Sequence, residues 1–132
     1  TLIIGLTPDT EGLIPEGDVR RLKEWGEEIS HRYNKPLNGP KRDSGYTLDF
    51  PRTQRVNACI IQEDITQGER IRKYRIEAMT DDQWQTICEG ESIGHKRIER
   101  FDDVETNSLR LVVQDSIASP KIVRLDAFYI EN

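Results

Sequence analysis

The sequence predicts a mainly β protein in which an antiparallel β-sandwich or jelly roll follows one short strand–helix unit. Apolar and polar residues alternate in several segments between residues 46 and 130, as they do in strands with one buried face. Turn sequences such as Thr66–Glu69 and Thr80–Asp82 separate these segments. Helical periodicity is confined to residues 19–33. Many strands joined by turns, with few helix signals, are typical of sandwiches and jelly rolls.

The chain begins with a short apolar run from Leu2 to Leu6, followed by turn residues. A run of this length is typical of a fully buried strand in a parallel sheet. A helix is predicted next, because apolar residues recur every three or four positions from Val19 to Tyr33, and Asp18 is the expected N-cap. The helix should end near Tyr33, because Pro36 disfavours helical geometry at the residue before it. Such a strand–helix unit is half of a βα repeat and cannot close a sheet alone.

Turn-forming residues between positions 38 and 45 mark the expected domain boundary. We therefore assign residues 1–37 to the strand–helix unit and residues 38–132 to the sandwich. Strands are expected at residues 46–50, 56–61, 71–79, 84–88, 93–101, 109–113 and 122–130.

Composition excludes two classes of function. The 132 residues carry a net charge of −5, and basic residues are mixed with acidic ones, whereas a nucleic-acid-binding protein would show a concentrated basic surface. No segment approaches the roughly 20 apolar residues of a membrane-spanning helix. The chain lacks an initiator Met and a signal peptide, so we expect it to be a piece of a longer protein.

Cysteine and histidine spacing predicts no metal site. Cys59 and Cys88 each lie within an apolar strand pattern, which favours two separate buried thiols over a disulfide. His31 and His95 are far apart and have no partner at the spacing of metal ligands.

Five motifs carry a resemblance to a known family. In chain order, Leu2–Pro15, Asp18–Gly26, Gln62–Ile65, Gly90–Ile98 and Ala118–Pro120 resemble segments of the α-L-fucosidases of glycoside hydrolase family 29. Leu2–Pro15 resembles the last strand and loop of the family's catalytic barrel, and Asp18–Gly26 resembles the helix that follows. Gln62–Ile65, Gly90–Ile98 and Ala118–Pro120 resemble the family's C-terminal discoidin-like sandwich. Each motif alone is only moderately specific, and the match depends on their order and spacing.

The resemblance implies both a fold and a function. The fold would be a galactose-binding-like jelly roll preceded by a strand–helix remnant of a (β/α) barrel. The parent protein would be an exo-acting, retaining α-L-fucosidase that releases terminal L-fucose from glycans without a cofactor. Its partners would be a fucosylated glycan and the rest of the catalytic domain. The form of Gly5–Asp9 is nearer the subgroup that acts on α-1,3/4-linked fucose, and the family implies an extracytoplasmic location, either periplasmic or secreted.

The sequence departs from this family in two ways. About a dozen residues lie between the helix and Tyr46, where the family has additional strands, so we expect residues to be missing after Leu37. Most of the barrel is also absent, including its nucleophile and its acid/base. The family's nucleophilic Asp follows an aromatic-rich strand end, and neither Trp25 nor Trp84 is followed by Asp. We therefore predict that this chain carries no catalytic residue and is inactive alone.

Thr7 and Asp9 are candidate substrate-proximal residues, because active sites of barrel enzymes lie at the ends of the strands that precede such loops. The alternative is that this loop is a turn chosen only to connect strand and helix.

His95, Lys96 and Arg97 are candidate carbohydrate-binding residues, because their side chains can hydrogen-bond sugar hydroxyls. The alternative is a strand edge whose long side chains pair with Glu99 or Asp102. Trp84 could be a sugar-stacking platform, but its strand pattern favours core packing.

Glu63 and Arg110 are candidates for an ion pair that spans two strands. A pair of this kind would fix the sheet register but would not by itself indicate a function.

Overall fold

The computed structural model describes residues 4–131. Its elements are helix α1 (Glu16–Tyr33), strand β1 (Lys41–Arg42), the 3₁₀ turn η1 (Asp43–Gly45), and strands β2 (Thr47–Glu63), β3 (Ile71–Thr80), β4 (Gln83–Gly90), β5 (Arg97–Ser116) and β6 (Ile122–Phe128). All strand pairs are antiparallel, so the prediction of a mainly β, antiparallel fold is confirmed.

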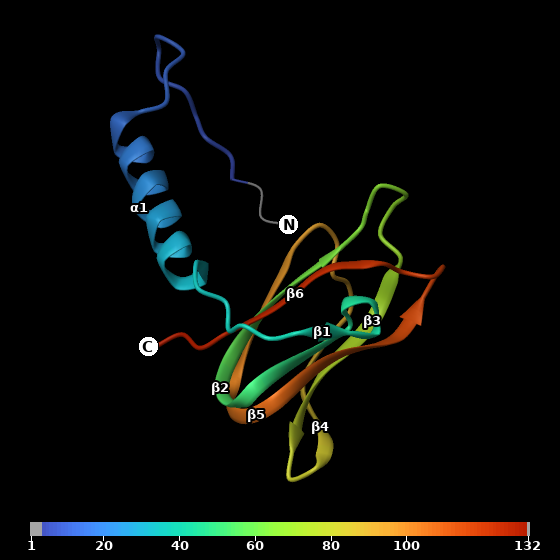
Figure 1. The fold of residues 1–132 in the computed structure, drawn as a ribbon. Helices are drawn as coiled ribbons and strands as arrows, with labels where there is room; N and C mark the ends of the chain where they lie inside the picture. Colours follow the sequence, from blue (N-terminus) through green and yellow to red (C-terminus); the bar gives the residue numbers. More distant parts are fainter. Residues whose placement is uncertain (1–3, 132) are drawn as a thin grey trace. The chain divides into compact units, whose positions relative to one another are not determined.

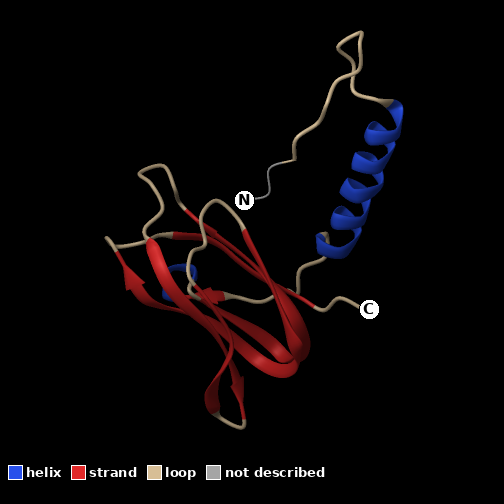
Figure 2. Cartoon of the chain, turned by 180° about the vertical axis from the view of Figure 1, so that it is seen from behind, coloured by secondary structure: helices blue, strands red, loops and turns tan. Residues whose placement is uncertain are grey.

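Contacts divide the described residues into two compact units, between Lys35 and Pro36. The first unit contains α1, and the second contains all the strands, as Figure 2 shows in red. The assignment of these units to a barrel part and a sandwich stays a prediction.

The sheet order is β1-β2-β5-β3-β4, with β6 also paired to β2. Two of the strands are long, and each replaces two predicted strands: β2 combines residues 46–50 with 56–61, and β5 combines 93–101 with 109–113. Both strands bend where the pairing between them is irregular. On β2, these irregularities lie between Asp49 and Gln54 and again between Val56 and Ala58. The curvature of β2 and β5 is visible in Figure 1. Irregular pairing of this kind bends a strand without ending it, so the sheet curls around its inner face.

Apolar side chains from all the long strands meet on that inner face. Leu48, Ile61, Tyr74, Leu109 and Leu125 are among the side chains that are almost completely buried. The alternation predicted for residues 71–79 and 109–113 is confirmed, because Tyr74, Ile76, Ala78, Leu109 and Leu111 all belong to this core. Burying such apolar surface is the main driving force for folding.

One polar link crosses the core. The Tyr74 hydroxyl of β3 donates a hydrogen bond to Glu99 of β5, and the Arg97 Nε donates to the same carboxylate oxygen at 2.7 Å. Burial, followed by this hydrogen bond to Glu99, raises the pKa of Tyr74, so the phenol stays protonated. Cys59 and Cys88 are both free, as predicted, and burial raises the pKa of the Cys88 thiol to about 11.

The N-terminal unit differs from its prediction in two places. Residues 4–9 form no strand, and Ile4 and Leu6 are exposed; Leu2 and Ile3, which the predicted strand also includes, lie outside the described residues. A strand requires a hydrogen-bonded neighbour, and none pairs with this segment in the described part of the chain. The predicted N-cap is also wrong, because α1 begins at Glu16 with Pro15 as the N-cap, which places Asp18 in the first turn. The helix ends at Tyr33, as predicted.

Helix α1 buries none of its residues. Val19 and Trp25, both in its apolar stripe, are 48% and 46% exposed. An amphipathic helix is normally stabilised by packing its apolar face against other protein, and nothing within residues 4–35, the described part of the helix's own unit, buries this face.

Candidate functional site

The loop that contains Thr7 and Asp9 is held by its own hydrogen bonds. One carboxylate oxygen of Asp9 accepts from the backbone N–H groups of Glu11 and Leu13, each at 2.9 Å. The backbone N–H of Asp9 donates to the Leu13 carbonyl at 2.8 Å. Asp9 therefore shapes this turn, an arrangement typical of Asp in loops. The substrate-proximal role of Thr7 and Asp9 stays a prediction.

The other candidate residues, His95, Lys96 and Arg97, are exposed and lie at the start of β5. The His95 carbonyl accepts a hydrogen bond from the Gln62 side chain at 3.1 Å. Arg97 pairs with Glu99, which is one of the two partners expected for a structural role. The carbohydrate-binding role of these three residues stays a prediction.

The expected ion pair between Glu63 and Arg110 is wrong. Glu63 is buried, and its Oε1 accepts hydrogen bonds from the backbone N–H groups of Arg70 and Ile71 at 2.9 and 3.3 Å. Arg110 pairs instead with Glu77. Sequence alone could not assign these partners, because they depend on which strands become neighbours and in which register.

Trp84 does not belong to the hydrophobic core, which corrects the expectation of core packing. It is partly exposed and lies opposite Met79 in the β3–β4 hairpin. Arg110 lies between the core residues Leu109 and Leu111, so its side chain points to the outer face of the sheet. The Arg110 guanidinium carbon lies over the Trp84 ring, 4.2 Å from its centroid, so Trp84 packs on that outer face.

A charged network holds this part of the outer face. Glu77, only 4% exposed, accepts hydrogen bonds from Arg75 Nε at 2.6 Å and from Arg110 Nε at 2.5 Å. Burial alone would raise the pKa of Glu77, but the hydrogen bonds from Arg110 and Arg75 outweigh it and lower the pKa. Glu77 therefore fixes the guanidinium on which Trp84 packs.

Two adjoining hollows open beside Trp84, each with a volume of about 400 Å³. Together we call them the Trp84 groove. Met79, Asp82 and Asn107 line both hollows. The first hollow is completed by Arg42, Asp49, Phe50, Trp84 and Ser108, and the second by Thr53, Thr80, Asp81, Glu105 and Thr106.

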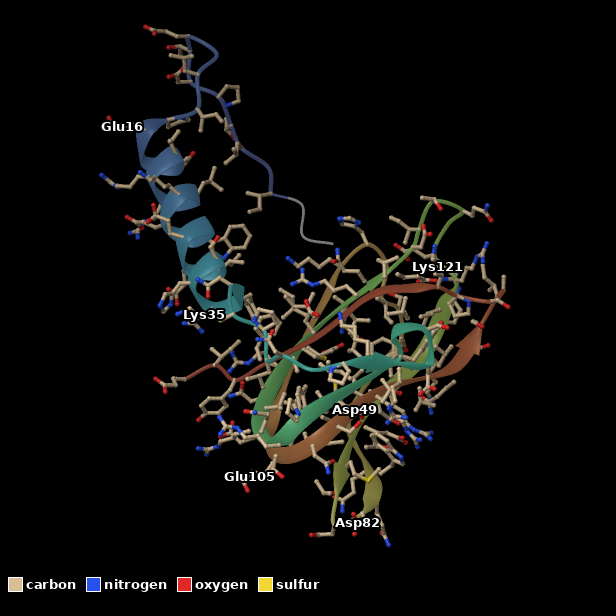
Figure 3. All side chains as sticks on the ribbon, in the orientation of Figure 1. Glu16, Lys35, Asp49, Asp82, Glu105 and Lys121 are labelled. Atoms are coloured by element: carbon tan, nitrogen blue, oxygen red, sulfur yellow. The ribbon has the colours of Figure 1, made fainter. Side chains whose placement is uncertain are left out.

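The side chains that line the groove come from strands β1 to β5 and from the turn between β3 and β4. Asp82 lies at the tip of the β3–β4 hairpin, Asp49 on β2 and Glu105 on β5, as Figure 3 shows. Asp81 and Asp82 both have positive φ angles, 50° and 59°, in the two-residue turn that joins paired Thr80 and Gln83. Sequence analysis identified this turn and Trp84, but not the residues that come from β2 and β5.

Stability should fall at acidic pH because of carboxylates such as Glu77 and Asp126. Asp126 accepts hydrogen bonds from Lys41 at 2.9 Å and Arg124 at 2.6 Å, and these outweigh the effect of burial and lower its pKa. A carboxyl whose pKa is lowered by folding stabilises the protein above its unfolded pKa of about 4, and this contribution is lost as the pH falls through the folded pKa. We expect the free energy of unfolding to be roughly constant from pH 7 to 5 and to decrease below pH 4.

The variant Glu77→Gln tests whether the Glu77 carboxylate contributes to this loss of stability at acidic pH. Its loss of stability relative to the parent should be about 1–3 kcal/mol at pH 7 and should shrink towards pH 3, where the parent's carboxylate also loses its charge. Urea denaturation followed by circular dichroism at pH 3, 5 and 7 measures the difference. Glu24→Gln, which removes an exposed pair with Arg21, is the control and should have little effect at any pH. A Glu77→Gln effect that is constant with pH would contradict this explanation.

No group of three or more His, Cys, Asp or Glu side chains in the described residues could hold a metal ion. Within the same residues, no helix is long and apolar enough to cross a membrane.

No family model matches the chain. Among curated proteins, α-L-fucosidase 1 of Arabidopsis thaliana is 25% identical over 164 aligned positions, which cover 96% of this chain and 32% of the plant protein. A protein of Oryza sativa subsp. japonica assigned as α-L-fucosidase 1 is 39% identical over 75 residues, which cover 57% of this chain and 14% of the rice protein. The chain thus spans a third or less of the curated relatives it matches.

Solved structures of proteins assigned as α-L-fucosidases are similar to nearly the whole chain. A crystal structure from Bacteroides thetaiotaomicron VPI-5482, assigned as an α-L-fucosidase, is 51% identical with a TM-score of 0.80 and covers 96% of this chain and 30% of that one. A glycoside hydrolase 29 family member from an unknown rumen bacterium is 26% identical with a TM-score of 0.78, covering 96% of this chain and 25% of that one. These similarities confirm the resemblance described above.

A chitosan-binding module from a Paenibacillus chitosanase/glucanase shares the fold of part of this chain. It is 12% identical, with a TM-score of 0.55, and covers 63% of this chain and 65% of the module. At this identity the comparison concerns the fold alone.

Proposed function

Because this chain is similar along nearly its whole length to α-L-fucosidases of glycoside hydrolase family 29, we propose that it is the C-terminal part of an exo-acting, retaining α-L-fucosidase. The parent enzyme would release terminal L-fucose from glycans, including α-1,3/4-linked fucose. The observation that carries this proposal is the 51% identity to the Bacteroides thetaiotaomicron protein over 96% of this chain.

In this proposal the chain supports the catalytic domain and does not itself catalyse. A retaining glycosidase requires two carboxyl groups about 5–5.5 Å apart, one as nucleophile and one as acid/base. The acid must stay protonated until it acts, which requires a raised pKa. Folding lowers the pKa of the carboxyls of Asp49, Asp64, Glu77 and Asp126, which is the opposite of what an acid catalyst requires.

The apolar face of α1 supports the same proposal. Val19 and Trp25 are about half exposed, as are Ile4 and Ile14 before the helix. Fully burying such a side chain contributes roughly 1.5–3 kcal/mol, so exposing several is costly for a protein of ordinary stability. This chain covers only 32% of the Arabidopsis protein and 30% of the Bacteroides thetaiotaomicron VPI-5482 protein, and the rest of the catalytic domain is the partner we propose for this face.

The family also suggests where the protein acts and how its sandwich is organised. We propose an extracytoplasmic location, periplasmic or secreted, and a discoidin-like sandwich from which residues after Leu37 are missing in this chain. The Arabidopsis alignment extends over 164 positions although this chain has 132 residues, so that relative contains residues without a counterpart here.

A second candidate function is carbohydrate binding without catalysis. The partly exposed Trp84 favours this alternative, because an aromatic face suits the C–H surface of a sugar. A purely structural sandwich without a ligand is the third. Sugar binding by this chain in isolation separates the second candidate from the third.

A chimera tests the first proposal. The segment of the Bacteroides thetaiotaomicron protein that aligns with this chain is replaced by it, and hydrolysis of 4-nitrophenyl α-L-fucoside is measured. We expect kcat/KM to stay within about tenfold of that parent, because differences of 1–2 kcal/mol are typical of substitutions that leave the reacting groups in place. The control is the same enzyme with the segment deleted, which should be inactive or insoluble.

The chimera's first product also tests the stereochemistry. Proton NMR recorded early in the reaction should show α-L-fucose, the product of retention. A folded chimera without activity would contradict the proposed function. β-L-fucose as first product would contradict a retaining mechanism for the barrel with which this segment is proposed to work. Parallel assays of the chimera and of the unmodified Bacteroides thetaiotaomicron enzyme with α-1,2- and α-1,3-fucosylated oligosaccharides show whether this segment changes the linkage preference.

A further inference from the structure

We propose that the Trp84 groove binds a neutral oligosaccharide. This inference goes beyond the hydrolytic function, because it assigns a binding site to the sandwich itself. It is carried by three observations: the position of Trp84, the polar groups around it and the size of the two hollows.

Trp84 supplies an apolar surface that is already fixed in place. The Arg110 guanidinium packs on the indole ring, and Glu77 holds Arg110 through a 2.5 Å hydrogen bond. The ring is thereby immobilised on the outer face, yet it remains partly exposed and lines the groove. A side chain that is ordered before binding costs less entropy when the ligand arrives, and an aromatic ring suits the C–H surface of a sugar.

The polar groups beside Trp84 suit neighbouring hydroxyl groups. Asp49 accepts hydrogen bonds from Arg42 and from the Ser108 hydroxyl, which is 2.6 Å from its Oδ1, and all three residues line the groove. Asn107 and Asp82 line both hollows. Planar carboxylate, amide and guanidinium groups present paired donors or acceptors that match adjacent sugar hydroxyls.

Size and charge restrict the class of ligand. Binding pockets for small molecules are typically about 300–1,000 Å³, so two adjoining hollows of about 400 Å³ have room for more than one sugar ring. The lining has four carboxylates, Asp49, Asp81, Asp82 and Glu105, but a single cationic side chain, that of Arg42. This balance disfavours sulfated, sialylated and other anionic glycans, and we therefore assign a neutral ligand.

Tryptophan fluorescence tests the site directly, because the chain contains only Trp25 and Trp84. In the variant Trp25→Phe, Trp84 is the sole tryptophan, and we titrate this variant with lactose and with 3-fucosyllactose. We expect a saturable fluorescence change with at least one of the two. In the variant Trp84→Phe, which keeps Trp25, the same sugars should cause no change.

A second variant keeps Trp84 and removes a polar contact. Asn107→Ala, in the Trp25→Phe background, should raise the dissociation constant by about fivefold or more, the effect of losing one hydrogen bond. Asn34→Ala makes the same chemical change at an exposed position at the end of α1 and should leave binding unchanged. Thermal unfolding of both variants verifies that each is folded.

The proposal is overturned if neither sugar produces a saturable change, or if Asn107→Ala binds as tightly as its parent. Only the choice of 3-fucosyllactose rests on the proposed function. Binding of both sugars, or of lactose alone, supports the proposed binding site whatever the activity of the parent enzyme. Absence of binding would not change the interpretation of the chimera experiment.

Discussion

Purified alone, the 132-residue chain is expected to hydrolyse 4-nitrophenyl α-L-fucoside no faster than buffer. General acid catalysis alone typically contributes 10²–10⁴-fold, and the nucleophile of a retaining enzyme contributes further, so losing both abolishes measurable turnover. Several acidic side chains of this chain have structural partners instead: Asp9 holds its loop, Glu77 holds two arginines, and Glu99 holds Tyr74 and Arg97.

The assay compares this chain with the chimera at equal molar concentration. Both are purified from a host strain without fucosidase activity, and the chain is repurified until its specific activity is constant. Turnover that stays with the folded chain through these steps would show that it contains a catalytic pair, and would contradict our assignment of catalysis to the rest of the enzyme.

Tyr74→Ala is expected to have the largest effect on stability, lowering the free energy of unfolding by about 3–5 kcal/mol, as other truncations of buried aromatic residues do. Tyr74 is completely buried, and its hydroxyl crosses the core to Glu99. Removing the side chain leaves a cavity and takes away one partner of a buried carboxylate. Urea denaturation at pH 7 measures the change.

Two further variants separate the contributions of the Tyr74 ring and hydroxyl. Tyr74→Phe keeps the ring and should cost about 1.5–3 kcal/mol, the range for a hydrogen bond to a charged group. Gly90→Ala places a Cβ in steric clash with the Tyr74 hydroxyl oxygen, so it should cost about 1–3 kcal/mol by overpacking.

In the Tyr74→Ala background the Gly90→Ala substitution should cost much less, because the clashing atoms are gone. Additive effects of the two substitutions would contradict the close contact between Gly90 and the ring.

Local patterns predicted the elements of this fold well. Residue alternation predicted the core positions Tyr74, Leu109 and Leu111, because neighbouring residues of a strand point to opposite faces. The end of α1 at Tyr33 followed from Pro36, whose effect is limited to its neighbour. The resemblance to α-L-fucosidases was likewise predictable, since it rests on short motifs and their order.

Long-range arrangement decided what the patterns could not. Trp84 was expected in the core, but it lies opposite Met79, the neighbour of the core residue Ala78, and therefore on the outer face of the sheet. There it packs on Arg110, which comes from β5. Which face of β4 is buried depends on how this strand pairs with β3, and alternation within a single strand does not reveal it.

The sequence by itself thus determined the fold class, the C-terminal end of the helix and most of the core, because these depend on residues that are near neighbours in the chain. Only the tertiary structure decided that β2 and β5 each continue through a bend, that Glu63 binds backbone N–H groups instead of Arg110, and that Trp84 lines a groove with Asp82 and Asn107. Each of these depends on contacts between distant segments, and strand pairing and register fix such contacts only when the whole sheet forms.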